Sequence, residues 1–325
     1  MTAPVLTAFP EMTPGVLAHL LDLVGEPGAL SPRKLLGPAA PLSPHALAQL
    51  YAAGILDAPA DSGPALTPEF KRAARVLLQP TTHVTVRVWG RHPICTETSF
   101  VFAGRVSKGG GVVFNRTDTF CRISGFANHR TVMELVGGVL PAAGHGQPPS
   151  FDAHLDVGAA AALCGLIDLL HRSSNTAAAH TEGPLADDVV AYAGRNWTTA
   201  GFGDLMAVLV PMCQAGDAPA ASEVRDGLAW LITQGVVSRD EGGRYDVTTA
   251  MAPIVSATAN LEGGLQWQRV TADADGTVTL SHRVFVVGTA PLVLSITQTT
   301  DHRVYVAAVR PEAIVDFIAS ELAAL

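Results

Sequence analysis

The sequence predicts an α+β fold built from two copies of one module. The first observation is a pattern of apolar residues, glycine and threonine that recurs at an offset of 181 positions. The second is that each copy is followed by short alternating apolar stretches, typical of strands, and then by a closing amphipathic segment. A repeat of well over about 100 residues is too long for a solenoid unit. It therefore predicts a pseudo-symmetric body whose halves share one sheet or one interface.

Both copies read helix, glycine, short apolar pair, polar loop, threonine, helix. Gly54 and Thr67 in the first copy match Gly235 and Thr248 in the second. The matching apolar positions are Leu47, Leu50, Ile55, Leu56, Leu66 and Phe70 in the first copy and Leu228, Leu231, Val236, Val237, Val247 and Met251 in the second.

Three segments follow from this repeat: a first repeat over 1–141, a connecting helix and linker over 142–183, and a second repeat over 184–325. The Ala-rich stretch 157–170 is too short for a bilayer span and contains Asp168, so it predicts a buried helix. Ser173 to Gly183 is small and polar, which predicts a linker.

Helix starts are predicted where a capping residue precedes proline, as at Thr13-Pro14, Ser43-Pro44 and Thr67-Pro68. Further helices are predicted near 129–139, 185–195, 201–214, 223–233, 248–259 and from Pro311 onward, and the passage 26–41 is predicted to be loop. Strands are predicted at 84–88, 100–102, 112–114, 120–123, 265–271, 278–287, 292–297 and 304–309. Their short connections require antiparallel pairing.

Composition narrows the class of protein. The chain has 325 residues, 48% of them hydrophobic and only 15% charged, with a net charge of −8. This apolar chain is expected to bury much surface or to offer it to a partner. The acidic balance and the lack of a Lys/Arg run argue against nucleic-acid binding.

The four cysteines form no CxxC pair, which predicts core thiols in a reducing compartment. The N-terminus lacks a secretion-signal pattern, so a cytoplasmic protein is expected.

Catalytic and metal motifs are weak. Ser31 to Lys34 matches S-x-x-K, but its usual companion motifs are absent and the segment is Pro/Gly-rich. Five histidines lie between His129 and His180, yet their spacing matches no metal motif, so no cofactor and no metal are predicted. No catalytic residue is predicted. An enzyme or small-molecule-binding protein with a site near His129–His180 stays open as an alternative.

A duplicated winged-helix regulator is the second alternative, because helix, turn, helix and strands recur in both copies. The helix after Thr67 carries Lys71, Arg72 and Arg75, whereas the matching helix at 250–260 has no basic residue. This difference argues against DNA binding by the pair.

The runs 47–56, 66–70 and 74–80, followed by a strand, resemble the N-terminal signature of the EspG family. The second half is similar in layout, with strands at Gly276–Val278, Phe285–Gly288 and Val304–Val309 before the helix that Pro311 opens. EspG proteins are cytosolic chaperones of type VII secretion. The resemblance implies a quasi-two-fold body with a central antiparallel sheet between two helical bundles. It also implies binding to the apolar tip of a helical PE/PPE-type substrate pair.

The predicted function is therefore a cytosolic chaperone or adaptor that binds an apolar helical segment of a partner protein. A strand-connecting loop and the second bundle are where a helix-in-groove contact is expected. The predicted contact residues are Val106, Lys108, Gly109, Phe202, Leu205 and Met206. No membrane span is predicted, and the chain is expected to be a monomer or a homodimer.

Overall fold

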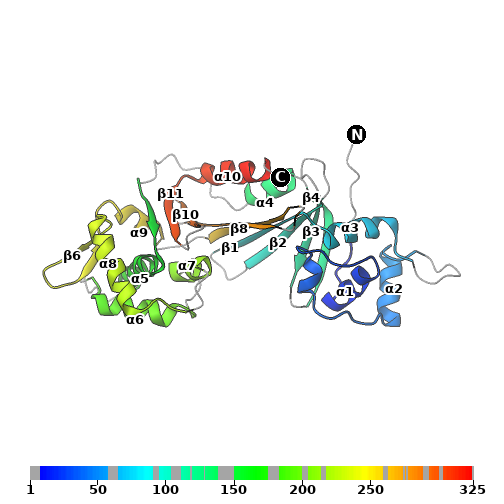
Figure 1. The fold of residues 1–325 in the computed structure, drawn as a ribbon, viewed down its shortest axis with the longest axis horizontal. Coiled ribbons are helices and arrows are strands. Elements are labelled where there is room, and N and C mark those ends of the chain that lie inside the picture. Colours follow the sequence, from blue (N-terminus) through cyan, green and yellow to red (C-terminus); the bar gives the residue numbers. More distant parts are fainter. Residues whose placement is uncertain are drawn as a thin grey trace.

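A computed structural model describes most of the chain. The described residues are 8–57, 65–90, 95–103, 111–117, 119–127, 129–137, 150–174, 183–199, 204–213, 217–258, 263–273, 275, 277–287, 293–299 and 303–323. The molecule is elongated, with a twisted sheet in the middle and a helical lobe at each end (Figure 1).

The first lobe is formed by residues before the sheet. It contains α1 (Pro14–Asp22), the 3₁₀ helix η1 (Pro32–Leu35), α2 (Pro44–Ala52) and α3 (Pro68–Leu78). The predicted caps are confirmed, because the hydroxyls of Thr13, Ser43 and Thr67 accept hydrogen bonds from the first turns of α1, α2 and α3. Each helix then buries its apolar face in one core with the outer part of the sheet.

The second lobe lies at the opposite end. It contains α5 (Val157–Ser174), α6 (Ala186–Asn196), α7 (Leu205–Cys213), α8 (Ala221–Thr233), the hairpin β6 (Val237–Arg239) and β7 (Tyr245–Val247), and α9 (Ala252–Thr258). Helix α5 is buried along most of its length and contacts α6, α7 and α8. The predicted Ala-rich core helix is therefore confirmed.

One antiparallel sheet joins the two lobes, which confirms the mixed α+β class. Its order is β4-β3-β2-β1-β8-β9-β10-β11-β5. The strands are β1 (Thr82–Gly90), β2 (Cys95–Phe102), β3 (Gly111–Arg116), β4 (Cys121–Ala127), β5 (Asp152–Leu155), β8 (Gly263–Ala272), β9 (Val278–Val287), β10 (Val293–Gln298) and β11 (Val304–Val309). From the central pair β1–β8, the strands run outward in chain order to β4 on one side and to β11 on the other, and β5 is added beyond β11. The register of the central pair places Val86 opposite Trp267.

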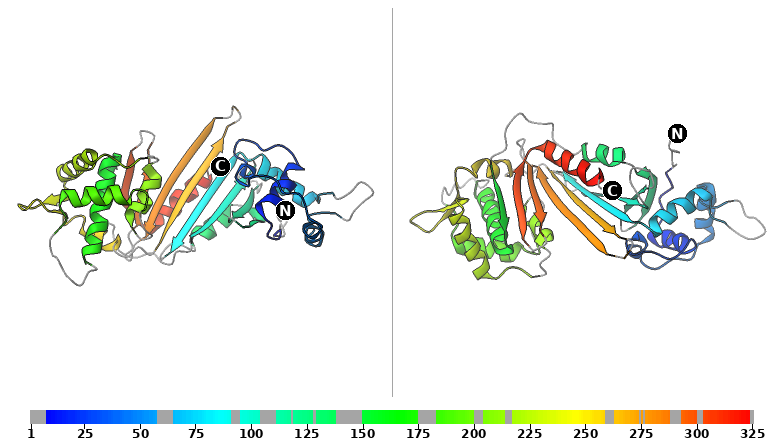
Figure 2. Two further views of the ribbon diagram at one scale, coloured as in Figure 1. Left: turned by 90° about the horizontal axis from the view of Figure 1, so that it is seen from below. Right: turned by 45° about the horizontal axis from the view of Figure 1, so that its top comes forward.

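Helices α4 (His129–Gly137) and α10 (Pro311–Ala323) cover one face of the sheet (Figure 1). They pack on a core that includes Phe100, Trp267 and Phe285. On the other face, each lobe covers only its own end of the sheet. The view from below shows the middle strands uncovered between the lobes (Figure 2).

Several elements differ from the sequence prediction. Strand β5 was not predicted, and the passage 26–41 contains η1. Helix α9 begins at Ala252, because Thr248 to Met251 form a turn before it. Gly276, at the start of one predicted strand, lies outside the described residues, as does most of the predicted linker. No helix in the described part of the chain is long and apolar enough to cross a membrane. Cys121, Cys164 and Cys213 are buried, free thiols.

Candidate functional site

The uncovered middle of the sheet forms a hollow that we call the central trough. Alternation along each strand sends every second side chain to this face. The trough has a cavity of about 280 Å³, and its lining residues are Leu35, His83, Thr85, Arg87, Glu97, Ser99, Gln266, Gln268 and Val270. They come from η1 and from three adjacent strands, β1, β2 and β8, so both halves of the sheet contribute to the site.

One end of the trough, around Arg87 and Gln266, is polar. Arg87 pairs with Glu97 across β1 and β2, with 2.6 Å between the guanidinium Nη2 and the carboxylate Oε2. The Gln266 side-chain nitrogen lies 2.8 Å from Nε2 of His282 on β9. Burial lowers the pKa of His282 and of His83, so both imidazoles are neutral at neutral pH. With Arg87 and Glu97 offsetting each other, the trough is polar but carries little net charge.

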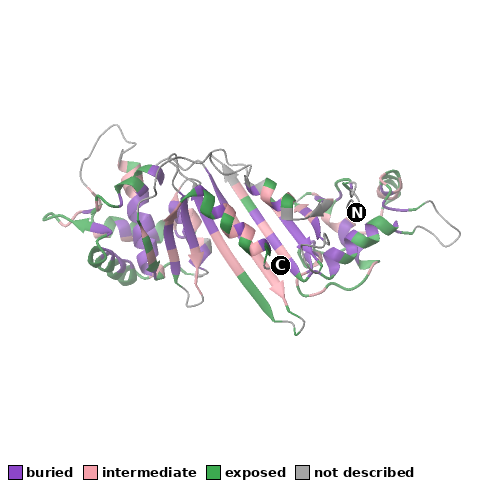
Figure 3. Ribbon diagram, turned by 90° about the horizontal axis from the view of Figure 1, so that it is seen from above, coloured by how far each residue is buried: buried purple, intermediate pink, exposed green. Residues whose placement is uncertain are grey.

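The other end of the trough is apolar and exposed. Val270 lies opposite Leu280 in the β8–β9 ladder. The side chains of Leu35, Val278 and Leu280 are 55%, 52% and 44% exposed, unusually high for large apolar residues. Figure 3 shows the exposed start of β9 in green beside the intermediate residues of β8. This end of the sheet face therefore leaves apolar side chains open to solvent.

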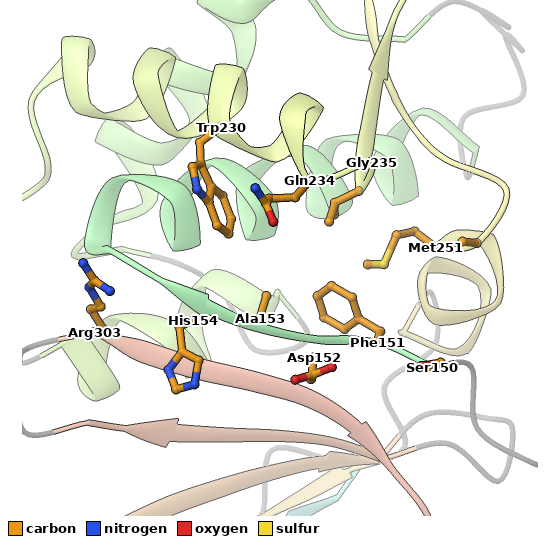
Figure 4. A pocket seen from close by; sticks show the side chains of 12 residues that line it. Ser150, Phe151, Asp152, Ala153, His154, Trp230, Gln234, Gly235, Met251 and Arg303 are labelled. Carbon is orange, nitrogen blue, oxygen red and sulfur yellow. The ribbon is translucent and has the colours of Figure 1, made fainter.

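A second hollow, which we call the edge groove, lies beside β5 in the second lobe (Figure 4). Its cavity is about 520 Å³. The groove lies between β5 and the helices α8 and α9, and Trp230, Gln234 and Met251 line it from the helical side. Phe151, Asp152 and His154 line it from the strand side. Its lining is mixed, with aromatic, amide and charged groups.

Of the six predicted contact residues, only Leu205 and Met206 lie among the described residues, and neither lines the cavity of the trough or of the groove. Val106, Lys108, Gly109 and Phe202 lie outside the described residues. Leu205 and Met206 begin α7 and are 2% and 0% exposed. Their backbone N–H groups donate to the carboxylate of Asp168, at 2.8 and 3.1 Å. In this structure both side chains belong to the core of the second lobe and offer no surface to a partner.

The histidine stretch is dispersed in the structure. His154 stacks on Tyr305 at the sheet edge, with 4.7 Å between the ring centroids. Nε2 of His171 lies 2.8 Å from the Val255 carbonyl oxygen in the second lobe. His145 and His180 lie outside the described residues. Within the described ranges, no three His, Cys, Asp or Glu side chains are grouped to hold a metal ion.

Ser31 of the S-x-x-K match has a structural role. Its hydroxyl donates to the carbonyl of Leu77, at 2.7 Å, and accepts from the N–H of Arg33. The side chain is 4% exposed. A hydroxyl held in this way fixes η1 against α3 and is not presented to a substrate.

Neither the trough nor the groove was predicted from the sequence. A signal for the trough was available, because Thr85 and Arg87 alternate with apolar residues in β1 and therefore share a face. The sequence did not show which residues of other strands would share this face. Gln266, Gln268 and His282 come from strands about 180 positions later in the chain, and only the central β1–β8 pairing brings them together.

No protein-family model and no curated protein sequence matches this chain. One similar solved structure is the type VII secretion system chaperone EspG5 of Mycobacterium tuberculosis, in complex with a PE25-PPE41 dimer. The sequence identity is 12% and the TM-score 0.48, over 96% of this chain and 94% of that chain.

Proposed function

We propose that this protein is a chaperone or adaptor that binds an apolar helical segment of a partner protein in the cytosol. The observation that carries the proposal is the central trough. An amphipathic helix laid across the open sheet face would bury Leu35, Val278 and Leu280 under its apolar stripe. Its polar side chains would meet the amide and imidazole groups around Gln266 and Gln268. The partner class we propose is a type VII secretion substrate, as the sequence resemblance implies.

The geometry of the sheet supports this proposal. A sheet face that is not covered by helices of its own chain exposes surface that another chain can bury. The opposite face packs against α4 and α10, whereas the described residues place no α-helix over the middle of this face, between the two lobes. The low net charge of the trough suits a protein surface and does not suit a phosphate backbone.

We also propose that the body is internally duplicated about a quasi-two-fold axis. Thr67 donates from its hydroxyl to the Gly54 carbonyl at 3.0 Å, and Thr248 donates to Gly235 at 2.9 Å. Gly54 and Gly235 have φ values of 66° and 68°, which favour glycine. Residues that lie 181 positions apart in the sequence therefore make equivalent hydrogen bonds and share a backbone conformation.

The central register supports the same axis. A two-fold axis requires that equivalent residues pair reciprocally across the seam. Thr85 pairs with Gln268 and Arg87 pairs with Gln266, which are the positions that the offset of 181 assigns reciprocally. The axis would pass between Val86 and Trp267, which are equivalent to each other. Two related lobes then border the trough from both ends.

The test is affinity capture from lysate of the organism that encodes the chain, followed by mass spectrometry. We expect one partner at a stoichiometric amount that survives a salt wash, because apolar burial is not screened by salt. Leu280→Lys places a charge on the apolar end of the trough without disturbing a buried residue. It should reduce the captured partner at least about tenfold, since desolvating an unpaired charge costs more than about 1.4 kcal/mol.

Leu23→Lys is the matched control. Leu23 is 60% exposed and lies at the end of α1, outside the trough. It should retain the partner at the wild-type level. Capture of no stoichiometric partner by the wild type, or equal loss by both variants, would reject the trough as the binding surface.

A further inference from the structure

Strand β5 is the last strand of the sheet on the side of the second lobe. It pairs with β11 on one side, through residues 152–155 and 304–307. The described residues provide no strand on its other side. Natural edge strands are commonly protected, because their outward N–H and C=O groups can pair with another chain.

The ladder identifies which groups point outward. The Thr299 N–H donates to the Arg303 carbonyl, so the odd-numbered residues of β11 exchange hydrogen bonds with β10. The Ala308 N–H donates to the Phe151 carbonyl at 2.9 Å, so the even-numbered residues of β11 exchange with β5. Phe151, Ala153 and Leu155 therefore face β11. In an antiparallel pair, alternation directs the N–H and C=O of Asp152 and His154 away from it.

These outward groups open onto the edge groove. Trp230 and Met251 line it from α8 and from the turn before α9, and Trp230 is 36% exposed (Figure 4). A free strand edge and a side-chain pocket beside it are the two parts that strand addition requires. Backbone hydrogen bonds would give affinity, and the pocket would select side chains.

We propose that the edge groove binds an extended segment of a partner protein, which adds to β5 as a further strand of the sheet. The segment alternates apolar and basic residues. The apolar side chains face Trp230 and Met251, and a basic side chain on the opposite face meets the exposed carboxylate of Asp152. That carboxylate contacts the Tyr305 hydroxyl at 3.5 Å. This site is separate from the central trough and goes beyond the helix-binding function.

The shape of the site favours a slim segment over a second copy of the chain. The edge of β5 borders a groove that α8 walls on its far side, a space that suits one extended segment. The sheet also holds an extended segment of its own at the other end. The Phe9 N–H donates to the Ile123 carbonyl of β4, and Met12 exchanges two backbone hydrogen bonds with Cys121. The Phe9 ring packs edge-on against Phe70. The sheet therefore already pairs, at its β4 end, with an extended segment of its own chain that carries an apolar anchor.

The probe is a fluorescein-labelled, capped hexapeptide of alternating valine and lysine, titrated into the full chain by fluorescence anisotropy. His154→Pro removes an outward N–H that the β11 ladder does not use, and proline is tolerated on an edge strand at such a position. We expect it to weaken binding about five- to tenfold. His154→Ala keeps the N–H and loses only the ring, so it should bind within about twofold of the wild type.

Two N-methylated peptides test the same backbone pairing by removing N–H groups from the peptide, with the protein left unchanged. One carries methyl groups on the valine nitrogens and the other on the lysine nitrogens. Only one of these sets faces β5, so one peptide should bind and the other should not. No binding of the parent peptide even at millimolar concentration would overturn the proposal, as would equal binding of both methylated peptides. A wild-type dimer that His154→Pro dissociates would also overturn it.

Discussion

Asp168 holds the start of α7 with a carboxylate that is 2% exposed. Both of its oxygens accept backbone N–H groups, from Leu205 and Met206. These bonds favour the charged form, but burial is the larger effect and raises the pKa of Asp168 to about 7. The sequence could not predict this role, because the residue it anchors lies 37 positions away.

This raised pKa predicts a definite pH dependence. Between about pH 4 and pH 7 the folded chain retains a proton on Asp168 that the unfolded chain releases. The free energy of unfolding should therefore fall as pH rises through this window, by up to about 4 kcal/mol. Asp168→Asn should remove this slope. Urea denaturation of both proteins across the window measures it.

The buried imidazoles act in the opposite direction. Burial lowers the pKa of His83, His171 and His282, so their contribution to stability rises with pH up to about 6.5. All three are present in both proteins, so the difference between the two curves isolates Asp168. Parallel curves for the wild type and Asp168→Asn would contradict the assignment.

Helices α5 and α8 cross at two glycines. A Cβ atom on Gly227 would lie 2.6 Å from the Cα of Ala159, and one on Gly158 would lie 2.5 Å from the Glu223 carbonyl oxygen. Both neighbours are backbone atoms, which cannot rotate away. The core of the second lobe therefore depends on this close approach.

Gly227→Ala should force the two helices apart and destabilise the protein by about 1–3 kcal/mol. Gly194→Ala in α6 is the matched control, since a Cβ there would meet nothing within 4 Å. It should stabilise the protein by up to about 1 kcal/mol through helix propensity. Thermal or chemical denaturation compares them, and equal effects would show that propensity rather than packing decides at Gly227.

Local signals predicted most of the elements. Proline after a capping residue located α1, α2 and α3, and alternation located the strands of the central sheet. Strand β5 was missed because it has only four residues and its partner β11 lies about 150 positions later. The edge groove was missed for the same reason. A local sequence pattern does not show which distant strands will pair, and both hollows depend on such long-range pairing.

At the scale of the whole molecule, the two halves meet at the β1–β8 ladder, where Val86 and Trp267 are both fully buried. Separation would expose two strand edges and this apolar seam. Fragments 1–141 and 142–325 should therefore aggregate when produced alone and form a soluble complex when produced together. Size-exclusion chromatography measures this. A folded monomer of either fragment by itself would show that its half is independently stable.

The outward chain order of the strands also has a kinetic consequence. Each meander closes through hairpins between strands that follow one another in the chain, whereas the seam pairs residues 82–90 with residues 263–271. Closing so long a loop is entropically costly and slow. Refolding should begin with two separately ordered meanders and end with a slower step that docks them. Until that step is complete, neither the central trough nor any surface shared by the two halves exists.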